Sequence, residues 1–553
     1  MQRIRLFLGM AALAALMCAA VIVGSPYAPV VQACPENIED IWAIEDTRSE
    51  SETPLVTALE NNGIPLAYDA QENTFYCTLG NSLTSDWPDL HLTAPDASDM
   101  KLIFSDDYRY DWCDEAVREG YRYAILVYND DKFNYAGIVF TGLPLISIHT
   151  DKEIGDLDVT AQVIVSCVGE EPVISAGRVH LRGKGSRNEE KKNMKVEFTH
   201  SKGGKKSFVD LPQFGVMDEI LLNPMVFDEL LVREKINWVL YAEMLGEEYE
   251  GGFGERKTAY AEVFVNNEYY GVYLMVEPMD EEKEIRKSGE SHLLTDGVYR
   301  TLPKKFSGER PYLSMSGETR VGVELRYESP GTQQFSGMKD YVELLAEKDE
   351  ERFAIKAAAC MDIESVVRYA VLTQAAGLTD NANNNVYIWA KRTPNGIQYQ
   401  FVPWDMDMSW GNAWGDVALK LGENLDAWRA FRIVDKIIAL NVGGAADLMV
   451  ERWDAWRKSI FTTEHVMELL QKYFGELSES GAIFRNAKRW GLEADTEGYE
   501  MIDYADIRFS ALDKAMDVVR NRGDEIPFFR YIDEDLDAYP FGLENGIGIS
   551  LEE

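Results

Sequence analysis

The sequence is short of basic residues. It has 55 Lys and Arg against 94 Asp and Glu in 553 residues, which gives a formal net charge of −39. Because nucleic-acid phosphates are held by clustered Lys and Arg, this balance argues against a nucleic-acid partner. The length and the 46 % hydrophobic content predict two or three globular domains.

Cysteine and histidine are also scarce, with six of each. Cys34, Cys77, Cys113, Cys167 and Cys360 lie far apart, without the CxxC or Cys/His spacing that structural zinc requires. Without a histidine cluster, a metal-dependent hydrolase is also disfavoured. Some of these cysteines could pair in an exported chain, and buried free thiols are the alternative.

A long apolar run occurs only at the N-terminus. Arg3 and Arg5 precede the run Leu6–Gly24, and small residues follow before Cys34. This order predicts an export signal over residues 1–33, and an extracellular or cell-surface location. Two forms of membrane anchoring stay open, because the run is long enough to remain in a bilayer and the residues before Cys34 partly fit a lipobox.

The rest of the chain changes character along its length. Short β-branched and aromatic runs separated by turn residues predict a mostly β region over 35–142. More strands follow, with a helix expected over 227–245 and a hairpin turning at Asn266–Asn267. Helical patterns then dominate, with one hairpin across 394–396. We therefore expect an α+β protein.

The first stretch with chemical potential is RVHLRGKGSRNEEKKNMKVEF at 178–198, a basic cluster in an acidic chain. Glycine lets backbone amides approach a phosphate closely, so Gly183 and Ser186 suit a phosphate loop. Lys192 is in phase with Met194 of the following strand, which predicts a lysine on the apolar face that needs an anion. A solvated edge strand with extended lysines is the alternative.

The second stretch is TDNANNNVY at 379–387. Asp380 and Asn385 have the spacing by which a kinase catalytic loop supplies an aspartate for the substrate hydroxyl and an asparagine for metal. Because Asp and Asn also favour turns through local hydrogen bonds, a plain turn is the alternative.

The third stretch is FVPWDMDMSWGN at 401–412, where Asp405 and Asp407 have apolar neighbours. Burying a carboxylate costs several kcal/mol unless a partner satisfies it. In an extended segment both carboxylates would share a face, and a cation such as Mg²⁺ would relieve their repulsion. In the alternative, one aspartate caps a turn and the other faces solvent.

Together the three stretches resemble the CotH kinase family, the spore coat protein H group of atypical protein kinases. RGKGS at 182–186 and KKNMK at 191–195 are similar to its Arg-Gly-Asn-Ser-Ser and Lys-Lys-Ser-Tyr-Lys motifs. VFVNNEYYGVYLMVE at 263–277 resembles its hairpin, and PWDMD at 403–407 its Pro-Trp-Asp-x-Asp signature. Arg233 resembles the arginine of the family's Leu-Ile-Arg-Asn-Lys helix.

The resemblance implies a protein-kinase-like two-lobe fold. It predicts a strand-rich N-lobe over 143–280 and a helix-rich C-lobe over 281–530, preceded by the mostly β accessory domain and followed by a tail over 531–553. It implies transfer of the ATP γ-phosphate, with Mg²⁺ or Mn²⁺, to Ser or Thr of surface or coat proteins.

The resemblance also implies site residues. Asp380 would orient or deprotonate the acceptor hydroxyl, and Lys192 would contact the α/β-phosphates, with Lys195 or Lys191 as its substitute. The implied metal ligands are Asn385, Asp405 and Asp407. The other implied nucleotide contacts are Arg182, Gly183, Ser186, Lys195 and, near the adenine, Glu277. A carboxylate should hold the lysine, and the candidates are Glu243 and Glu262.

The sequence departs from the family motifs at Lys184, Gly185, Asn193 and Asn267. These departures leave open a non-catalytic surface or coat scaffold with a degenerate kinase-like domain. In that alternative, the region 35–142 would bind a partner or glycan.

Overall fold

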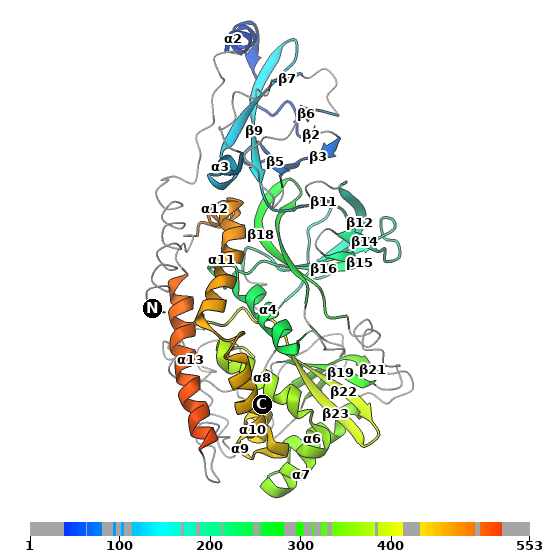
Figure 1. Cartoon of the computed structure of the whole chain (residues 1–553). Coiled ribbons are helices and arrows are strands. Elements are labelled where there is room, and N and C mark those ends of the chain that lie inside the picture. The colour runs from blue at the N-terminus through cyan, green and yellow to red at the C-terminus, as the bar shows by residue number, and fades with distance from the viewer. Residues whose placement is uncertain are drawn as a thin grey trace, which may run out of the picture. The chain divides into compact units, whose positions relative to one another are not determined.

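The computed structural model describes the chain in two compact units (Figure 1). Unit 1 comprises Met1–Leu230, Arg256–Pro278 and Gln471–Glu497, and unit 2 comprises Leu231–Glu255, Met279–Leu470 and Gly498–Glu553. The described residues are 38–521 except 62, 80–91, 96–100, 104–112, 168–170, 184–188, 212–213, 247–253, 255, 281–294, 303–311, 315–321, 329–334, 382–384, 413–431 and 493–497. The predicted signal at 1–33, Cys34, Ser186 and the tail at 531–553 lie outside them.

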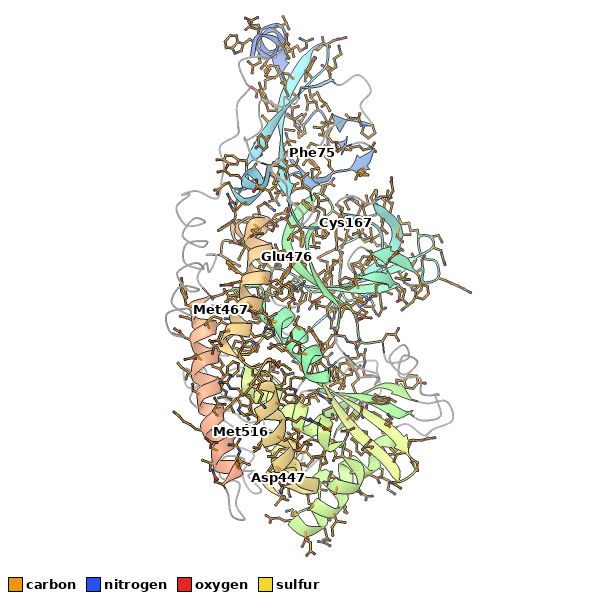
Figure 2. The ribbon with its side chains drawn as sticks, viewed as in Figure 1. Phe75, Cys167, Asp447, Met467, Glu476 and Met516 are labelled. Atoms are coloured by element: carbon orange, nitrogen blue, oxygen red, sulfur yellow. The ribbon has the colours of Figure 1, made fainter. Side chains whose placement is uncertain are left out.

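The first part of unit 1 is a mixed sheet with the strand order β4-β5-β9-β8-β7, and β1 pairs with β9. Its core includes Phe75, labelled in Figure 2, and both Phe75 and Ile138 are fully buried. The strands are β1 (Ser49–Glu50), β4 (Ala67–Asp69), β5 (Thr74–Thr78), β7 (Lys101–Ile103), β8 (Arg122–Tyr128) and β9 (Lys132–Thr141). The remaining elements are α2 (Ile38–Thr47), α3 (Cys113–Arg118) and the small sheet β2 (Glu60–Asn61), β3 (Ile64–Pro65) and β6 (Leu92–Thr93). The region is strand-rich, and its independence as an accessory domain stays a prediction.

The second part of unit 1 is a closed barrel with the order β10-β11-β12-β13-β16-β18-β17. β10 closes it by pairing in parallel with β17, with Leu145 opposite Glu262. The strands are β10 (Leu145–His149), β11 (Val159–Ser166), β12 (Val173–Leu181), β13 (Met194–Thr199), β16 (Glu219–Asn223), β17 (Thr258–Val265) and β18 (Glu268–Val276); β14 (Val209–Leu211) and β15 (Gly215–Met217) form a separate pair. Helix α12 (Ala482–Trp490) packs on β18.

The predicted hairpin of the barrel is confirmed. Asn266 and Asn267 connect β17 to β18 with φ of 50° and 63°. Two successive positive φ values suit the tight turns whose twist matches that of the strands, and asparagine tolerates them better than most residues. The substitution of asparagine for the family's turn glycine is therefore compatible with the hairpin.

Unit 2 has a five-stranded sheet with the order β20-β21-β19-β22-β23, covered by helices (Figure 1). The strands are β19 (Thr295–Leu302), β20 (Tyr312–Ser314), β21 (Gly322–Glu328), β22 (Val386–Thr393) and β23 (Gly396–Pro403). The helices are α4 (Arg233–Leu245), α6 (Lys339–Leu345), α7 (Glu350–Cys360), α8 (Ile363–Ala376), α9 (Arg432–Ala439), α10 (Ala445–Trp456) and α13 (Tyr499–Arg520); α11 (Thr463–Glu479) begins in unit 2 and ends in unit 1.

Helix α8 leads the chain to the functional residues. Asp362 caps its N-terminus by accepting a 2.9 Å hydrogen bond from the Ser365 amide, and Gly377 ends it in a left-handed conformation with φ of 62°. Of the helix expected over 227–245, α4 forms Arg233–Leu245, and the expected hairpin across 394–396 is present. The mixed α+β class is confirmed, while the two-lobe arrangement stays a prediction. No helix within the described ranges is long and apolar enough to cross a membrane.

Candidate functional site

The open end of the β22–β23 hairpin brings predicted site residues together. Val386 pairs with Pro403, so Asn385 and Trp404 are the next residues outward from the paired strands. Asn385 Nδ2 donates a 2.7 Å hydrogen bond to Asp380 Oδ2. Asp405 follows Trp404 directly, so the structure gathers Asp380, Asn385 and the start of the PWDMD segment in one place.

Asn381 links Asn385 to the start of the PWDMD loop by hydrogen bonds. Its side-chain amide donates to the carbonyl oxygens of Trp404 at 2.9 Å and Asn385 at 3.2 Å, and its own carbonyl accepts from the Tyr369 hydroxyl at 2.6 Å. Asn381 is fully buried, and nothing among the described residues donates to its Oδ1. This buried oxygen is left with capacity to bind a cation or water.

The backbone at the site is strained. Asn385, Asp405 and Trp410 have φ of 55°, 58° and 54°, values that non-glycine residues adopt rarely and at a cost of about 1–3 kcal/mol. Because β23 ends at Pro403 and Asp405 is left-handed, the segment is not extended. The prediction that Asp405 and Asp407 share a strand face is therefore wrong in its premise. Both residues are half-buried.

Glu234 in the first turn of α4 holds this loop. It is 4 % exposed, and its carboxylate accepts from the Met406 amide and, at 2.8 Å, from Trp238 Nε1. Trp238 in turn packs edge-on against Trp404, with ring centroids 6.0 Å apart. The helix therefore fixes the loop through both a backbone bond and an aromatic contact.

Asn237, one residue before Trp238, provides the second attachment. It donates to the Met406 carbonyl at 2.7 Å and to Ser409 Oγ at 2.9 Å, and it accepts from Trp410 Nε1 at 2.9 Å. The sequence reasoning missed both Glu234 and Asn237. The sequence of α4 begins Arg-Glu-Lys-Ile-Asn, so these two polar residues do not stand out from their charged neighbours.

The oxygen donors of this site suit a hard divalent cation. Carboxylate and amide oxygens such as those of Asp380, Asn385 and Asp405 are ligands that Mg²⁺ takes together with nucleotide phosphates. No group of three or more His, Cys, Asp and Glu that could hold a metal occurs in the described part of the chain. A metal here would therefore need amide or phosphate oxygens as well.

The comparison with protein families agrees with this geometry. The model of CotH kinase proteins matches residues 179–512. The chain belongs to the CotH kinase family. The matched region includes the basic stretch from residue 179 onward, α4, both hairpins and the PWDMD loop, so the predicted resemblance is confirmed. No curated protein matches the chain.

In unit 1, the CotH lysine motif is arranged differently from the prediction. The buried lysine is Lys191, whereas Lys192 is half-buried. Lys191 Nζ donates to the carbonyl oxygens of Pro224 at 2.8 Å and of Val272, and to Asn486 Oδ1 at 2.9 Å. The strand begins only at Met194, so its alternation does not extend back to Lys192.

The environment of Lys191 is polar but uncharged. Burial lowers the pKa of its ammonium well below the usual value. Three acceptors nevertheless match the three N–H groups of an ammonium, and the Tyr273 ring centroid lies 4.8 Å from Nζ. These contacts favour the charged form and connect three segments of unit 1.

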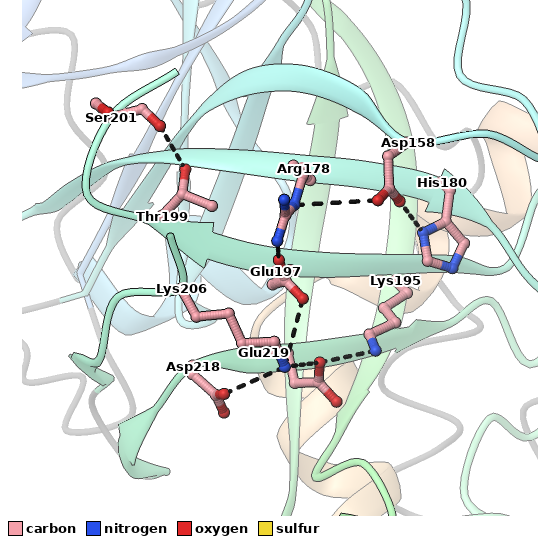
Figure 3. A network of polar contacts seen from close by, with 10 residues as sticks. All are labelled: Asp158, Arg178, His180, Lys195, Glu197, Thr199, Ser201, Lys206, Asp218 and Glu219. Atoms are coloured by element: carbon pink, nitrogen blue, oxygen red, sulfur yellow. Dashed lines mark hydrogen bonds and ion pairs between the residues drawn. The ribbon is translucent and has the colours of Figure 1, made fainter. Parts of the chain in front are cut away.

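Lys195 belongs to a network on the outer side of the barrel strands (Figure 3). Its Nζ is 2.7 Å from Glu219 Oε2, and Lys206 Nζ is 2.9 Å from the same oxygen. Burial alone would raise the pKa of the Glu219 carboxyl, but the charges of Lys195 and Lys206 bring it below the usual value. Further pairs are Arg178 with Glu197, Lys206 with Glu197 and Asp218, and His180 with Asp158. Of the basic stretch, Arg178 and Lys195 are thus paired with carboxylates here.

The other predicted nucleotide contacts also lie in unit 1. Arg182 donates its backbone N–H to Asn193, and Gly183 is exposed with φ of 79°. Glu277 is buried, with Oε2 3.4 Å from the Lys257 amide. Their roles toward a nucleotide stay predictions.

The carboxylates suggested as partners of the motif lysine bind other groups. Glu262 accepts from Arg485 at 2.8 Å and from the Tyr269 hydroxyl at 2.6 Å, both within unit 1. Glu243 lies 2.8 Å from His465 Nε2, both within unit 2. Lys195 of the motif is bound to a different carboxylate, Glu219.

Proposed function

We propose that the chain is an exported CotH protein kinase that transfers the ATP γ-phosphate to Ser or Thr hydroxyls of surface or coat proteins. The observation that carries this proposal is the 2.7 Å hydrogen bond from Asn385 to Asp380 beside the PWDMD loop. This bond holds the two residues of the Asp-x-x-x-x-Asn motif against each other. A plain surface turn would not require that contact.

In this proposal Asp380 receives the proton of the acceptor hydroxyl. The hydroxyl oxygen forms a bond to the γ-phosphorus as the bond to the β-γ bridging oxygen breaks, so the products are ADP and a phosphoester. Asn385 orients Asp380 through its amide. Because phosphoryl transfer depends mainly on positioning and charge neutralisation, a rigid carboxylate is the main contribution expected from these residues.

Asn385 and Asp405 are the residues proposed to hold Mg²⁺ or Mn²⁺, with Asp407 as a further ligand or a support of the loop. When bound, the metal would neutralise charge on the nucleotide phosphates. The hydrogen bonds between α4 and Met406 support this assignment, since a metal ligand must be held in a fixed position.

Lys192 stays the proposed lysine for the α/β-phosphates. Lys191 is buried against three acceptors, and Lys195 would have to open its ion pair with Glu219 to reach a phosphate. Arg182, Gly183, Ser186 and Glu277 remain the other proposed nucleotide contacts. Export through residues 1–33, with membrane anchoring by that segment or by a lipid on Cys34, rests on the N-terminal sequence alone.

The test is a phosphotransfer assay on the purified chain. Labelled ATP, Mg²⁺ or Mn²⁺ and a serine-rich protein acceptor should give labelled acceptor with wild type and much less with Asp405→Ala. Equal labelling by both would contradict the metal assignment, and no labelling by wild type under either metal would contradict the kinase proposal.

A non-catalytic scaffold is the second candidate, because Lys191 and Lys195 of the motif are bound to protein groups. Binding of nucleotide separates the candidates. A true site stabilises the fold by about 2.7 kcal/mol at a hundredfold excess of ligand over Kd. No thermal shift with ATP and either metal would favour the scaffold.

A further inference from the structure

Arg300 of β19 reaches the same hairpin end from the neighbouring strand. Its Nη2 donates a 3.1 Å hydrogen bond to Asn385 Oδ1, and its guanidinium carbon lies 5.8 Å from the centroid of the Tyr387 ring. Its Nε is buried and has no hydrogen-bond partner among the described residues. This arginine is thus held by a neutral amide and an aromatic face.

The contact fixes the orientation of the Asn385 amide. A guanidinium only donates hydrogen bonds, so Oδ1 must face Arg300, and Nδ2 then faces the Asp380 carboxylate. Arg300, Asn385 and Asp380 therefore form one polar chain. The same orientation directs the oxygen that a cation would need toward a positive charge.

Arg300 and a divalent cation cannot share this oxygen easily. Like charges within a few ångströms repel, and the repulsion is strong where the groups are partly buried. A metal ion that takes Asn385 Oδ1 must therefore displace the guanidinium or accept its repulsion.

We propose that Arg300 is an internal competitor of the metal: it occupies Asn385 Oδ1 when no cation is bound and releases it when one binds. This inference rests on the proposed function, in which Asn385 is a metal ligand. It makes Arg300 a positioning residue that sets how much free Mg²⁺ or Mn²⁺ the site requires.

The test is direct Mn²⁺ binding to the whole chain without nucleotide, followed by the spin-resonance signal of free Mn²⁺. Arg300→Met keeps an apolar stem beside Tyr387 and removes the charge, and it should tighten the Kd for Mn²⁺ about tenfold, the equivalent of about 1.4 kcal/mol. Arg300→Lys, which keeps the charge, should stay closer to wild type. Arg326→Met is the matched control, because Arg326 lies on β21 and its Nη1 is 3.6 Å from Glu324.

Asn385→Ala tests whether the gain passes through the shared oxygen. In an Asn385→Ala background, Arg300→Met should no longer produce the tenfold gain in Mn²⁺ affinity, because Asn385 Oδ1 is absent. Unchanged or weaker Mn²⁺ binding by folded Arg300→Met overturns the inference, as does a gain that persists without Asn385 or an absence of Mn²⁺ binding by wild type.

Failure of this inference is distinguishable from failure of the proposed function. If wild type phosphorylates the acceptor but Arg300→Met gives no gain in Mn²⁺ affinity, the competition is wrong and the kinase proposal stands. If the gain occurs and depends on Asn385 while no acceptor is labelled, the competition is supported and the kinase proposal is not.

Discussion

Asn237 Nδ2 donates a 2.7 Å hydrogen bond to the carbonyl oxygen of Met406, which lies between the two aspartates of the PWDMD loop. The same side chain binds Ser409 and Trp410, so one buried amide satisfies three groups of a loop 169 residues away in sequence. This relationship explains how a left-handed Asp405 and Trp410 can persist, because the hydrogen bonds offset their backbone strain.

Asn237→Ala should destabilise unit 2 substantially. It removes three hydrogen bonds and leaves the buried Trp410 Nε1 without its acceptor, while Met406 and Ser409 still bond to each other at 3.0 Å, so we expect a loss of about 2–4 kcal/mol. Urea denaturation followed by tryptophan fluorescence measures the loss. Asn395→Ala, in the exposed turn of the β22–β23 hairpin, is the control and should change stability by less than about 0.5 kcal/mol. Equal effects of both substitutions would mean that the hydrogen bonds of Asn237 contribute little to the free energy of unfolding.

Asp380→Asn should reduce phosphotransfer about 10²- to 10⁴-fold, the range expected for loss of a general base. The new side chain still offers an oxygen to Asn385 Nδ2, so the loop should keep its arrangement. Thermal stabilisation by ATP and metal should therefore be retained. Loss of nucleotide binding together with turnover would indicate structural damage in place of a chemical role.

Glu219 predicts a specific dependence of stability on pH. The pKa of its carboxyl is lower in the folded chain than its usual value, so its charge stabilises the fold above the unfolded pKa. That contribution is lost as the pH falls through the folded pKa, below about 4.5. Between pH 5 and 3 the stability of wild type should fall more steeply than that of Glu219→Gln, by at most about 1.4 kcal/mol per pH unit.

Denaturant midpoints measured from pH 3 to pH 7 check this prediction. Glu243→Gln is a useful control, because Glu243 lies outside the barrel network and contacts His465. If the denaturant midpoints of Glu219→Gln and wild type fall in parallel below pH 5, the charges of Lys195 and Lys206 do not perturb Glu219 as described.

Local features of this fold could be predicted from sequence. The two hairpins follow from turn residues between β-rich runs, and helix α8 from its periodicity between Asp362 and Gly377. The contact between Asp380 and Asn385 follows from a short spacing. In each case the information lies within a few residues of the feature, so no tertiary contact has to be known.

Features set by distant residues could not be predicted in this way. The shape of the PWDMD loop depends on Glu234 and Asn237, which no local pattern connects to Asp405. Lys191 is buried because Asn486 and two distant carbonyl oxygens surround it, whereas strand alternation pointed to Lys192. The alternation rule holds only inside a strand, and β13 starts two residues after Lys192.

The neighbouring lysines give opposite predictions. Lys191→Met removes the ammonium that three buried acceptors bind, so it should lower the stability of unit 1 by about 2–5 kcal/mol whether or not nucleotide is present. Lys192→Met removes a half-buried charge and should change stability by less than about 1 kcal/mol, while abolishing most of the stabilisation by ATP. Thermal denaturation with and without ATP and Mg²⁺ measures both effects. If Lys192→Met keeps the full nucleotide shift and Lys195→Met loses it, the phosphate contact belongs to Lys195, and its ion pair with Glu219 must open on binding.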